Sequence, residues 1–375
     1  MSKKESYLGV DIGSASIKIV ELTREKGMPR LLNYGYLEQE IDITRGENSD
    51  EKVRKLAFFI KAICEKSKMV SKNVVAAMPS FSVFSSVVSL PDMPKKDLAS
   101  AVWWEAKKII PMNIEDVVLD WKVLGGTSKE ARQADLSDAD KPEDLSQINP
   151  LEKKDKPGEK EIDKKNLKIL ITTAPKKLVQ RYIEVFQLAK MNLLSLETES
   201  FALSRALVGR DPSVIMIIDL GTSTSDIIIV DQGVPSLSRS VKIGGINFTQ
   251  AISQSLGISN EMAESFKRDL VSGKQALNEL PDSLKEIMDS MVSEIKYSLE
   301  LYQSQSLKPV EKIVLSGGSS FLPNFGGYIS QAVGTRVYLG NPWARVIYPV
   351  DLKPVIEKIG PRFAVAVGLA MREIV

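Results

Sequence analysis

The stretch that decides the fold is residues 214–230, which read Val-Ile-Met-Ile-Ile-Asp-Leu-Gly-Thr-Ser-Thr-Ser-Asp-Ile-Ile-Ile-Val. Two apolar runs flank an Asp-x-Gly turn, a pattern typical of two strands joined by a tight connection. Residues 7–20 follow the same plan, with the sequence Tyr-Leu-Gly-Val-Asp-Ile-Gly-Ser-Ala-Ser-Ile-Lys-Ile-Val. A single turn of this kind closes many ordinary hairpins. Its duplication, together with a late Gly-Gly turn at residues 317–318, predicts one motif used twice for a common purpose.

Both turns suit the binding of phosphate. A glycine lets the backbone approach a phosphate closely, and neighbouring hydroxyl and N–H groups can then bond to its oxygens. The carboxylates of Asp11 and Asp219 would repel a polyphosphate unless a hard cation lay between them, and Mg²⁺ binds through one or two carboxylates, water and phosphate. Lys18, on the returning strand, would add positive charge at the same phosphates. Two such turns facing each other would clamp one nucleotide.

Composition narrows the classes of function. The 375 residues exceed the roughly 250–300 that one core usually organises, so two or more domains are expected. Fifty Lys and Arg against 48 Asp and Glu leave a net charge of +2, which predicts no attraction to nucleic acid or anionic lipid. The absence of histidine excludes Ser-His-Asp and Cys-His nucleophiles and His-ligated zinc. A single cysteine, Cys64, and a polar N-terminus without a signal-peptide pattern predict a reducing, cytoplasmic compartment.

Hydrophobic periodicity predicts alternating strands and helices along the rest of the chain. Strands are expected over residues 30–37, 73–78, 82–90, 117–124 and 167–174, with a last strand at 313–315. Helices are expected over residues 51–69, 95–110, 176–190, 260–270, 281–302 and 362–375. The elements from 82 to 190 predict a β-α-β-β-α subdomain.

Residues 128–166 interrupt that subdomain. Of these 39 residues, 20 are charged, none is aromatic and three are proline. A segment with so little apolar surface cannot offset the entropy of ordering its chain, so we expect a disordered insertion. A tether for a partner is an alternative role.

Four further stretches carry a family resemblance. They are Leu-Glu-Thr-Glu-Ser-Phe-Ala-Leu at 196–203, Lys-Ile-Gly-Gly-Ile-Asn-Phe-Thr-Gln-Ala-Ile at 242–252, Ala-Glu-Ser-Phe-Lys at 263–267 and Pro-Arg-Phe-Ala-Val-Ala-Val-Gly-Leu-Ala-Met-Arg-Glu at 361–373. With the two turns and the inserted subdomain, the chain resembles the actin, Hsp70 and sugar-kinase superfamily and, within it, the FtsA and PilM families. It is most similar to the PilM family of type IV pilus assembly, over nearly the whole chain apart from the insertion. The end of the sequence lacks the basic amphipathic membrane helix of FtsA-like chains.

The resemblance implies an α/β, actin-like (ribonuclease H-like) fold of two lobes with an FtsA/PilM-type 1C subdomain. The nucleotide would lie in the cleft between the lobes. Four subdomains are expected, namely 1A (residues 1–80, 192–211 and 358–375), 1C (81–191, with the insertion 128–166), 2A (212–250 and 309–357) and 2B (251–308).

The resemblance also implies a site for ATP and Mg²⁺. Glu199 is similar to the residue that positions the attacking water in hydrolytic members, although a charge favoured at a helix start is an equal alternative. Glu264 and Lys267 would contact the ribose and base, or form a plain surface pair at i, i+3. The implied nucleotide-binding residues are Asp11, Gly13, Ser14, Ser16, Lys18, Asp219, Gly221, Thr222, Thr224, Gly245, Glu264, Lys267, Gly317, Gly318 and Ser319, with Asp11 and Asp219 near Mg²⁺ through water.

A PilM-like chain is expected to be a cytoplasmic scaffold, at most a slow ATPase, that is held at the inner face of the cytoplasmic membrane by binding the N-terminal cytoplasmic segment of PilN. Trp103 and Trp104 are adjacent on a predicted helix and diverge by about 100° around its axis, so one could face that partner, although both could instead fill the core. Two alternative functions are also compatible with the sequence. One is an FtsA-like, self-associating filament protein. The other is a small-molecule kinase, for which we find no substrate-binding loop.

Overall fold

The computed structural model describes residues 5–39, 49–124, 166–271, 282–306 and 308–375. They form two compact units, of which the larger comprises Met1–Val83 and Pro175–Val375 and the smaller comprises Phe84–Ala174. The finer division into four subdomains stays a prediction.

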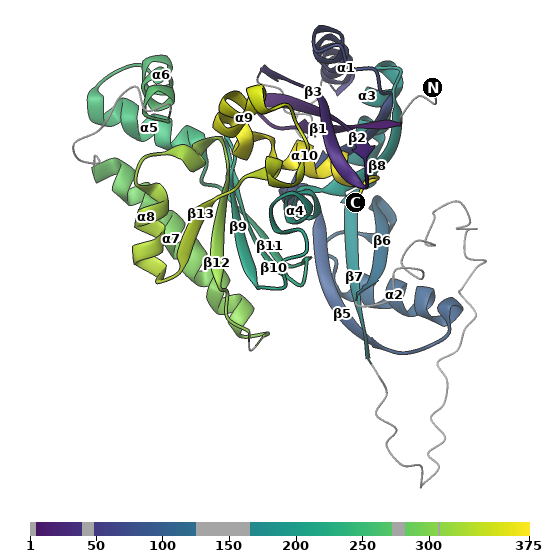
Figure 1. The fold of residues 1–375 in the computed structure, drawn as a ribbon. Coiled ribbons are helices and arrows are strands. Elements are labelled where there is room, and N and C mark those ends of the chain that lie inside the picture. Colours follow the sequence, from purple (N-terminus) through teal and green to yellow (C-terminus); the bar gives the residue numbers. More distant parts are fainter. Residues whose placement is uncertain (1–4, 40–48, 125–165, 272–281, 307) are drawn as a thin grey trace. The chain divides into compact units, whose positions relative to one another are not determined.

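The larger unit contains two five-stranded sheets (Figure 1). The first has the order β3-β2-β1-β4-β8, with β1 at Ser6–Ile12, β2 at Ser16–Glu25, β3 at Met28–Glu38, β4 at Asn73–Met78 and β8 at Asn192–Thr198. Strand β1 pairs antiparallel with β2 and parallel with β4. The strand, turn and strand predicted over 7–20 are therefore confirmed.

The second sheet repeats this plan. Its order is β11-β10-β9-β12-β13, with β9 at Ile215–Leu220, β10 at Ser225–Asp231, β11 at Val234–Val241, β12 at Lys312–Gly317 and β13 at Arg336–Leu339. Strand β9 pairs antiparallel with β10 and parallel with β12, just as β1 pairs with β2 and β4. The predicted duplication thus extends from one turn to a whole sheet.

Helices pack on these sheets and between them. α10 (Ala364–Met371) packs on β1, β2 and β4. Together with α4 (Glu199–Leu203), it belongs to a core cluster that also contains Val75 of the first sheet and Ile217 of the second. α1 (Ser49–Lys66) packs against α3 (Lys176–Leu188). A second cluster joins the second sheet to α5 (Gly245–Leu256), α6 (Asn260–Val271), α7 (Asp282–Gln303) and α8 (Phe325–Val333).

The smaller unit has a core of its own. Its sheet has the order β5-β7-β6, with β5 at Phe84–Pro91, β6 at Val117–Leu124 and β7 at Asn166–Pro175. α2 (Lys95–Ile109) buries Leu98, Val102 and Ala106 against Ile169 and Ile171 of β7. Apolar residues recur every three to four positions along α2 and at every second position along β7. These two periods are typical of a helix and a strand, so the sequence predicted both elements.

Two predictions near the C-terminal end were wrong. Residues 313–315 are not in the last strand, because β13 follows and pairs parallel with β12. Four residues are too few to show a strand period. The helix predicted over 362–375 is only α10, preceded by a 3₁₀ turn at Gly360–Phe363. After it, the N–H groups of Arg372 and Ile374 bond to carbonyls three residues back, at 3.1 and 2.9 Å, so the chain tightens and leaves the α-helix.

Other elements had no clear sequence signal, namely β8, β11, α5, α8 and α9 (Lys353–Ile359). Helix α3, grouped by sequence with the inserted subdomain, lies in the larger unit. The predicted insertion falls outside the described residues, except for Asn166, which begins β7.

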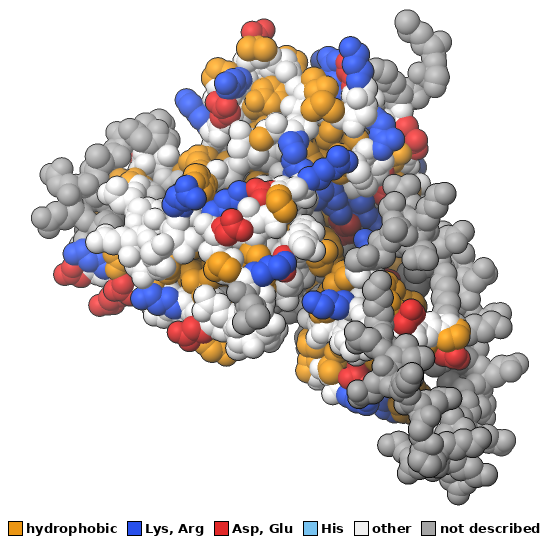
Figure 2. All heavy atoms as spheres, turned by 60° about the horizontal axis from the view of Figure 1, so that its bottom comes forward, with side chains coloured by type: hydrophobic (Ala, Val, Ile, Leu, Met, Phe, Trp, Pro, Cys, Tyr) orange, Lys and Arg blue, Asp and Glu red, His pale blue; other side chains and the backbone are white. Residues whose placement is uncertain are grey.

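No helix among the described residues combines the length and the apolar character that a membrane crossing requires. On the face of the molecule in Figure 2, basic, acidic and hydrophobic side chains are interspersed. This mixture agrees with the near balance of charges in the sequence.

Candidate functional site

The tips of the two duplicated hairpins meet. The Ser14 hydroxyl, after β1, lies 3.4 Å from the Ser223 hydroxyl, after β9. Different backbone hydrogen bonds hold the two turns. In the first, the Gly13 N–H donates to the Ser16 carbonyl at 2.9 Å. In the second, the Gly221 carbonyl accepts a 2.9 Å hydrogen bond from the N–H of Gly245, the first residue of α5.

Space for a side chain is tight at Gly13 and lacking at Gly221. A Cβ on Gly13 would lie 3.2 Å from the Ser16 carbonyl oxygen, and one on Gly221 would lie 2.6 Å from the Thr224 carbonyl oxygen. The Thr222 carbonyl accepts from the Ile246 N–H at 2.9 Å, so the second turn is bound to the start of α5 at two points. Both turns therefore have the compact backbone that close approach to a ligand requires.

Acidic side chains gather behind the turns. Asp11 and Lys18 are register partners on β1 and β2, and Lys18 Nζ lies 2.9 Å from Asp11 Oδ2. Asp219 and Asp226 are register partners on β9 and β10. Asp226 is buried and accepts a hydrogen bond from the Ser240 hydroxyl. The equivalent position thus carries a lysine in one sheet and a carboxylate in the other.

Glu199 completes this cluster. It is the first residue of α4, and its Oε2 accepts 2.9 Å hydrogen bonds from both the N–H and the hydroxyl of Ser80. Burial raises the pKa of Glu199 well above its usual value, and the charges of Asp226 and Asp11 act in the same direction. The predicted helix-start position is therefore correct, but Glu199 also shares an environment with the carboxylates of both hairpins.

The pKa of Asp219 is raised for the same reasons. Burial raises its pKa to about 7, and the charges of Asp226 and Asp11 also raise it, while a hydrogen bond to Ser316 and the charge of Lys18 oppose the shift. Carboxylates that cannot all ionise together indicate a site with too little positive charge. A hard cation fits such a set. The described residues hold no group of three or more carboxylate or thiol side chains placed to ligate a metal directly.

A second group of predicted residues meets at α5 and α6. Lys267 is buried, at 8% exposure, and its Nζ lies 2.9 Å from the Gly245 carbonyl, 2.7 Å from Thr249 Oγ1 and 2.7 Å from Glu264 Oε2. The Thr249 hydroxyl donates to the same Glu264 oxygen at 2.6 Å. A buried lysine excludes the surface-pair alternative, because each of its contacts is internal.

The late Gly-Gly turn reaches this second group. A Cβ on Gly245 would lie 3.0 Å from Ser319 Oγ and 3.4 Å from Lys267 Nζ, so Ser319 faces the start of α5. Gly317 has a φ of +84°, which favours glycine. The predicted residues Gly245, Glu264, Lys267 and Ser319 are therefore brought together around the N-terminus of α5.

The sequence of the chain matches the family described as "Type IV pilus assembly protein PilM" over residues 9–141 and 155–374. The chain belongs to the PilM family of type IV pilus assembly proteins. The family assignment and the fold that the sequence resemblance implied are both confirmed.

Solved structures agree on the fold. The structure titled "PilM-PilN type IV pilus biogenesis complex" aligns with a TM-score of 0.77 at 24% identity, over 100% of both chains. The ethanolamine utilization protein EutJ from Carboxydothermus hydrogenoformans aligns with a TM-score of 0.53 at 14% identity, over 98% of this chain and 90% of that one. The actin-like fold of this PilM-family chain is thus shared by proteins with little sequence identity to it.

The two tryptophans lie in the smaller unit, on α2. Their rings meet edge to face with centroids 5.0 Å apart, and Lys107 Nζ lies 5.4 Å and 5.5 Å from the centroids of Trp103 and Trp104. Trp104 is 52% exposed. The alternative in which both rings fill the core therefore fails for Trp104.

Two residues of the candidate site, Asp226 and Ser80, were not predicted from the sequence. Asp226 had a readable signal, because it follows Asp219 by the same seven positions that separate Lys18 from Asp11. Ser80 had none, since it approaches Glu199 from a 3₁₀ turn after β4.

Proposed function

We propose that this PilM-family chain is an ATP-binding scaffold of the type IV pilus machine, and that its nucleotide site governs the binding of a PilN-like partner. The observation that carries the proposal is the meeting of the two hairpin tips at Ser14 and Ser223, in front of the acidic cluster. A ligand held by both hairpins stabilises one arrangement of the two sheets, and only such differential affinity can change a partner site.

The phosphates of ATP would lie between the turns, against Gly13, Ser14, Gly221 and Thr222, with Lys18 contributing charge. Mg²⁺ would supply the positive charge that the acidic cluster lacks, held through water by Asp11 and Asp219. Backbone N–H groups and hydroxyls at compact turns are neutral donors that suit phosphate oxygens. These donors orient the phosphates, while the carboxylates hold the ion.

The nucleoside would lie against the group formed by Gly245, Glu264, Lys267 and Ser319. A carboxylate accepts hydrogen bonds and repels phosphate, so Glu264 suits a ribose hydroxyl. Gly245 leaves room beside Lys267 and Ser319, which a side chain would occupy.

Turnover, where it occurs, would be slow. Glu199 can act as a base toward water only when ionised, and burial among other carboxylates opposes its ionisation. In this proposal ATP acts mainly as a ligand that sets the state of the scaffold.

The partner side rests on family membership and on the solved PilM-PilN complex. We propose that the exposed Trp104, with Lys107 against its ring, contributes to binding a short segment of PilN. Exposed tryptophan beside a cation is typical of anchor positions for peptides. Through this partner the chain would lie at the cytoplasmic face of the inner membrane.

The test is calorimetric titration with a peptide that copies the cytoplasmic N-terminus of a PilN-like protein, with and without Mg-ATP. The proteins are the wild type, Asp219→Ala and the control Asp282→Ala, whose carboxylate is exposed on α7. The proposal expects peptide binding that Mg-ATP alters in the wild type and the control but not in Asp219→Ala. ATP binding without peptide binding would contradict the scaffold, and ATP-dependent pelleting or phosphate transfer to a small acceptor would favour the FtsA-like or kinase alternative.

A further inference from the structure

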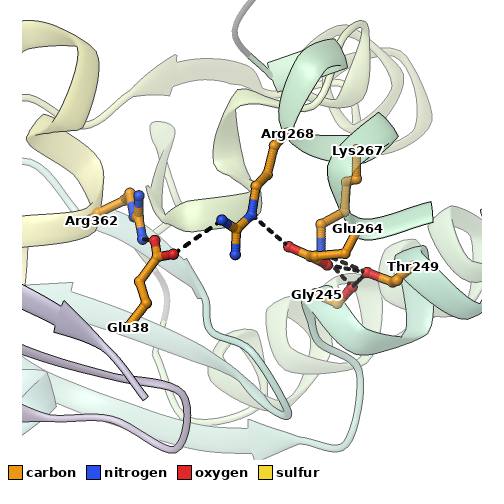
Figure 3. Close-up of polar contacts among 7 residues, drawn as sticks. All are labelled: Glu38, Gly245, Thr249, Glu264, Lys267, Arg268 and Arg362. Carbon is orange, nitrogen blue, oxygen red and sulfur yellow. Dashed lines mark hydrogen bonds and ion pairs between the residues drawn. The ribbon is translucent and has the colours of Figure 1, made fainter. Parts of the chain in front are cut away.

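Three segments that are far apart in the sequence meet at Glu38, the last residue of β3 (Figure 3). Its Oε1 accepts a 2.7 Å hydrogen bond from the guanidinium of Arg362, just before α10. Its Oε2 lies 3.1 Å from NH1 of Arg268, on α6. Glu38 belongs to the first sheet and α6 packs with the second, so this carboxylate joins the two halves of the larger unit.

Arg268 links Glu38 to the residues that are proposed to bind the nucleoside. Its Nε lies 3.4 Å from Glu264 Oε1, while the other oxygen of Glu264 is held by Lys267 and Thr249. Glu264 therefore has one oxygen on the buried group around Gly245 and the other on the arginine that Glu38 holds. Figure 3 shows the side chains in this order, from Arg362 to Thr249.

Arg362 lies beside Gly318, one of the residues that the family resemblance implies in nucleotide binding. A Cβ on Gly318 would lie 3.9 Å from Cγ and Nε of Arg362. The Arg362 guanidinium also lies 5.5 Å from the ring centroid of Tyr36, on β3. Of the two arginines bound to Glu38, Arg268 thus contacts Glu264 of the proposed nucleoside site, and Arg362 lies beside the Gly-Gly turn.

The ion pairs of Glu38 with Arg362 and Arg268 are suited to breaking and re-forming. Burial opposes ionisation of Glu38, but hydrogen bonds and charge from Arg362, with the charge of Arg268, outweigh it and lower the Glu38 pKa. The Glu38 and Arg268 side chains are nevertheless 35% and 61% exposed. Ion pairs this exposed contribute little to folding, so the bridge is poorly suited to a purely structural role.

We infer that Glu38 is a positioning residue of the nucleotide site, which fixes Glu264 through Arg268 and contacts the Gly-Gly turn through Arg362, so that binding of the nucleoside and contact between the two halves depend on each other. The inference rests on the proposed function, because it takes Glu264 to accept from a ribose hydroxyl. It adds the residue by which the first half of the chain takes part in nucleoside recognition.

The experiment measures Mg-ATP, Mg-2′-deoxy-ATP and Mg-tripolyphosphate binding to the full chain and to Glu38→Gln. We expect Glu38→Gln to weaken ATP binding about two- to fivefold, to bind the two nucleotides more equally, and to leave tripolyphosphate binding unchanged. Glu294→Gln is the matched control, because its carboxylate is 37% exposed and lies 3.1 Å from Arg239, and neither residue is among those proposed to contact the nucleotide. It should alter none of the three affinities.

Two further results separate the explanations. Arg268→Gln should reproduce the loss of discrimination, and adding Glu38→Gln to it should cause little further loss of discrimination, since the path from Glu38 to Glu264 runs through Arg268. An unchanged ratio of the two nucleotide affinities in Glu38→Gln, or an equal loss for tripolyphosphate, would overturn the inference. A wild type that binds none of the three probes would overturn the proposed function instead.

Discussion

The two sheets of the larger unit have the same strand order, the same directions and the same turn, yet they differ in charge at one equivalent position. In the first sheet Asp11 faces Lys18 across the strand pair, and the two form an ion pair. In the second sheet Asp219 faces Asp226, another acid. Duplication of a fold therefore fixes where side chains meet, while a single residue decides whether the pair neutralises itself or accumulates negative charge.

The largest effect on stability is expected from breaking the ion pair between Asp11 and Lys18. Lys18→Met should lower the free energy of unfolding by about 3 kcal/mol, because it leaves the buried Asp11 without its cation among other carboxylates. Lys308→Met is the control, since Lys308 pairs with Asp231 at the same 2.9 Å but is 51% exposed, against 15% for Lys18. Chemical denaturation should show a loss of no more than about 1 kcal/mol for that variant. Equal losses would mean that the acidic cluster does not depend on Lys18.

A second prediction compares the two turns by the same substitution. Gly221→Ala should cost about 2 kcal/mol, since its Cβ would lie 2.6 Å from a backbone oxygen of the same turn, which cannot move away without changing the turn. Gly13→Ala meets the equivalent oxygen at 3.2 Å and should cost less than about 1 kcal/mol. Thermal melts of the two variants, with Gly327→Ala as an open-space control, test the order. A larger loss for Gly13→Ala would contradict it.

This comparison also shows what the sequence could and could not predict. The two Asp-x-Gly turns could be predicted because each depends on local sequence, with the apolar runs, the glycine and the aspartate within a few residues. Asp226 shares that local register and could have been found by aligning the two hairpins. In contrast, Glu38, Arg268 and Arg362 come from three distant segments and are polar residues of ordinary type, so nothing in their local sequence indicates that they meet. Family resemblance supplied the assignment of Glu264 and Lys267, while the burial of Lys267 required coordinates.

The smallest expected effect concerns the acidic pair and pH. The folded-state pKa of Asp219, about 7, lies above its ordinary value of 3.8, so the folded protein binds this proton more tightly than the unfolded chain does. Stability without nucleotide should therefore fall as pH rises from about 4 to 7, because ionisation is opposed only in the folded state. Asp219→Asn removes that cost and should raise the free energy of unfolding, relative to wild type, by on the order of 1 kcal/mol at pH 8 and by little at pH 5.

The measurement is a set of melting curves between pH 5 and pH 8 on nucleotide-free protein, with Asp282→Asn as the control for an exposed carboxyl group. The difference between Asp219→Asn and wild type should grow with pH, whereas the control should stay level. The mirror substitution sharpens the result. If the acid facing Asp219 is what distinguishes the two sheets, Asp226→Asn should also reduce the pH dependence, because its charge raises the pKa of Asp219. A pH profile unchanged in both variants would mean that the two hairpins are electrostatically alike, and the contrast drawn from their register would be wrong.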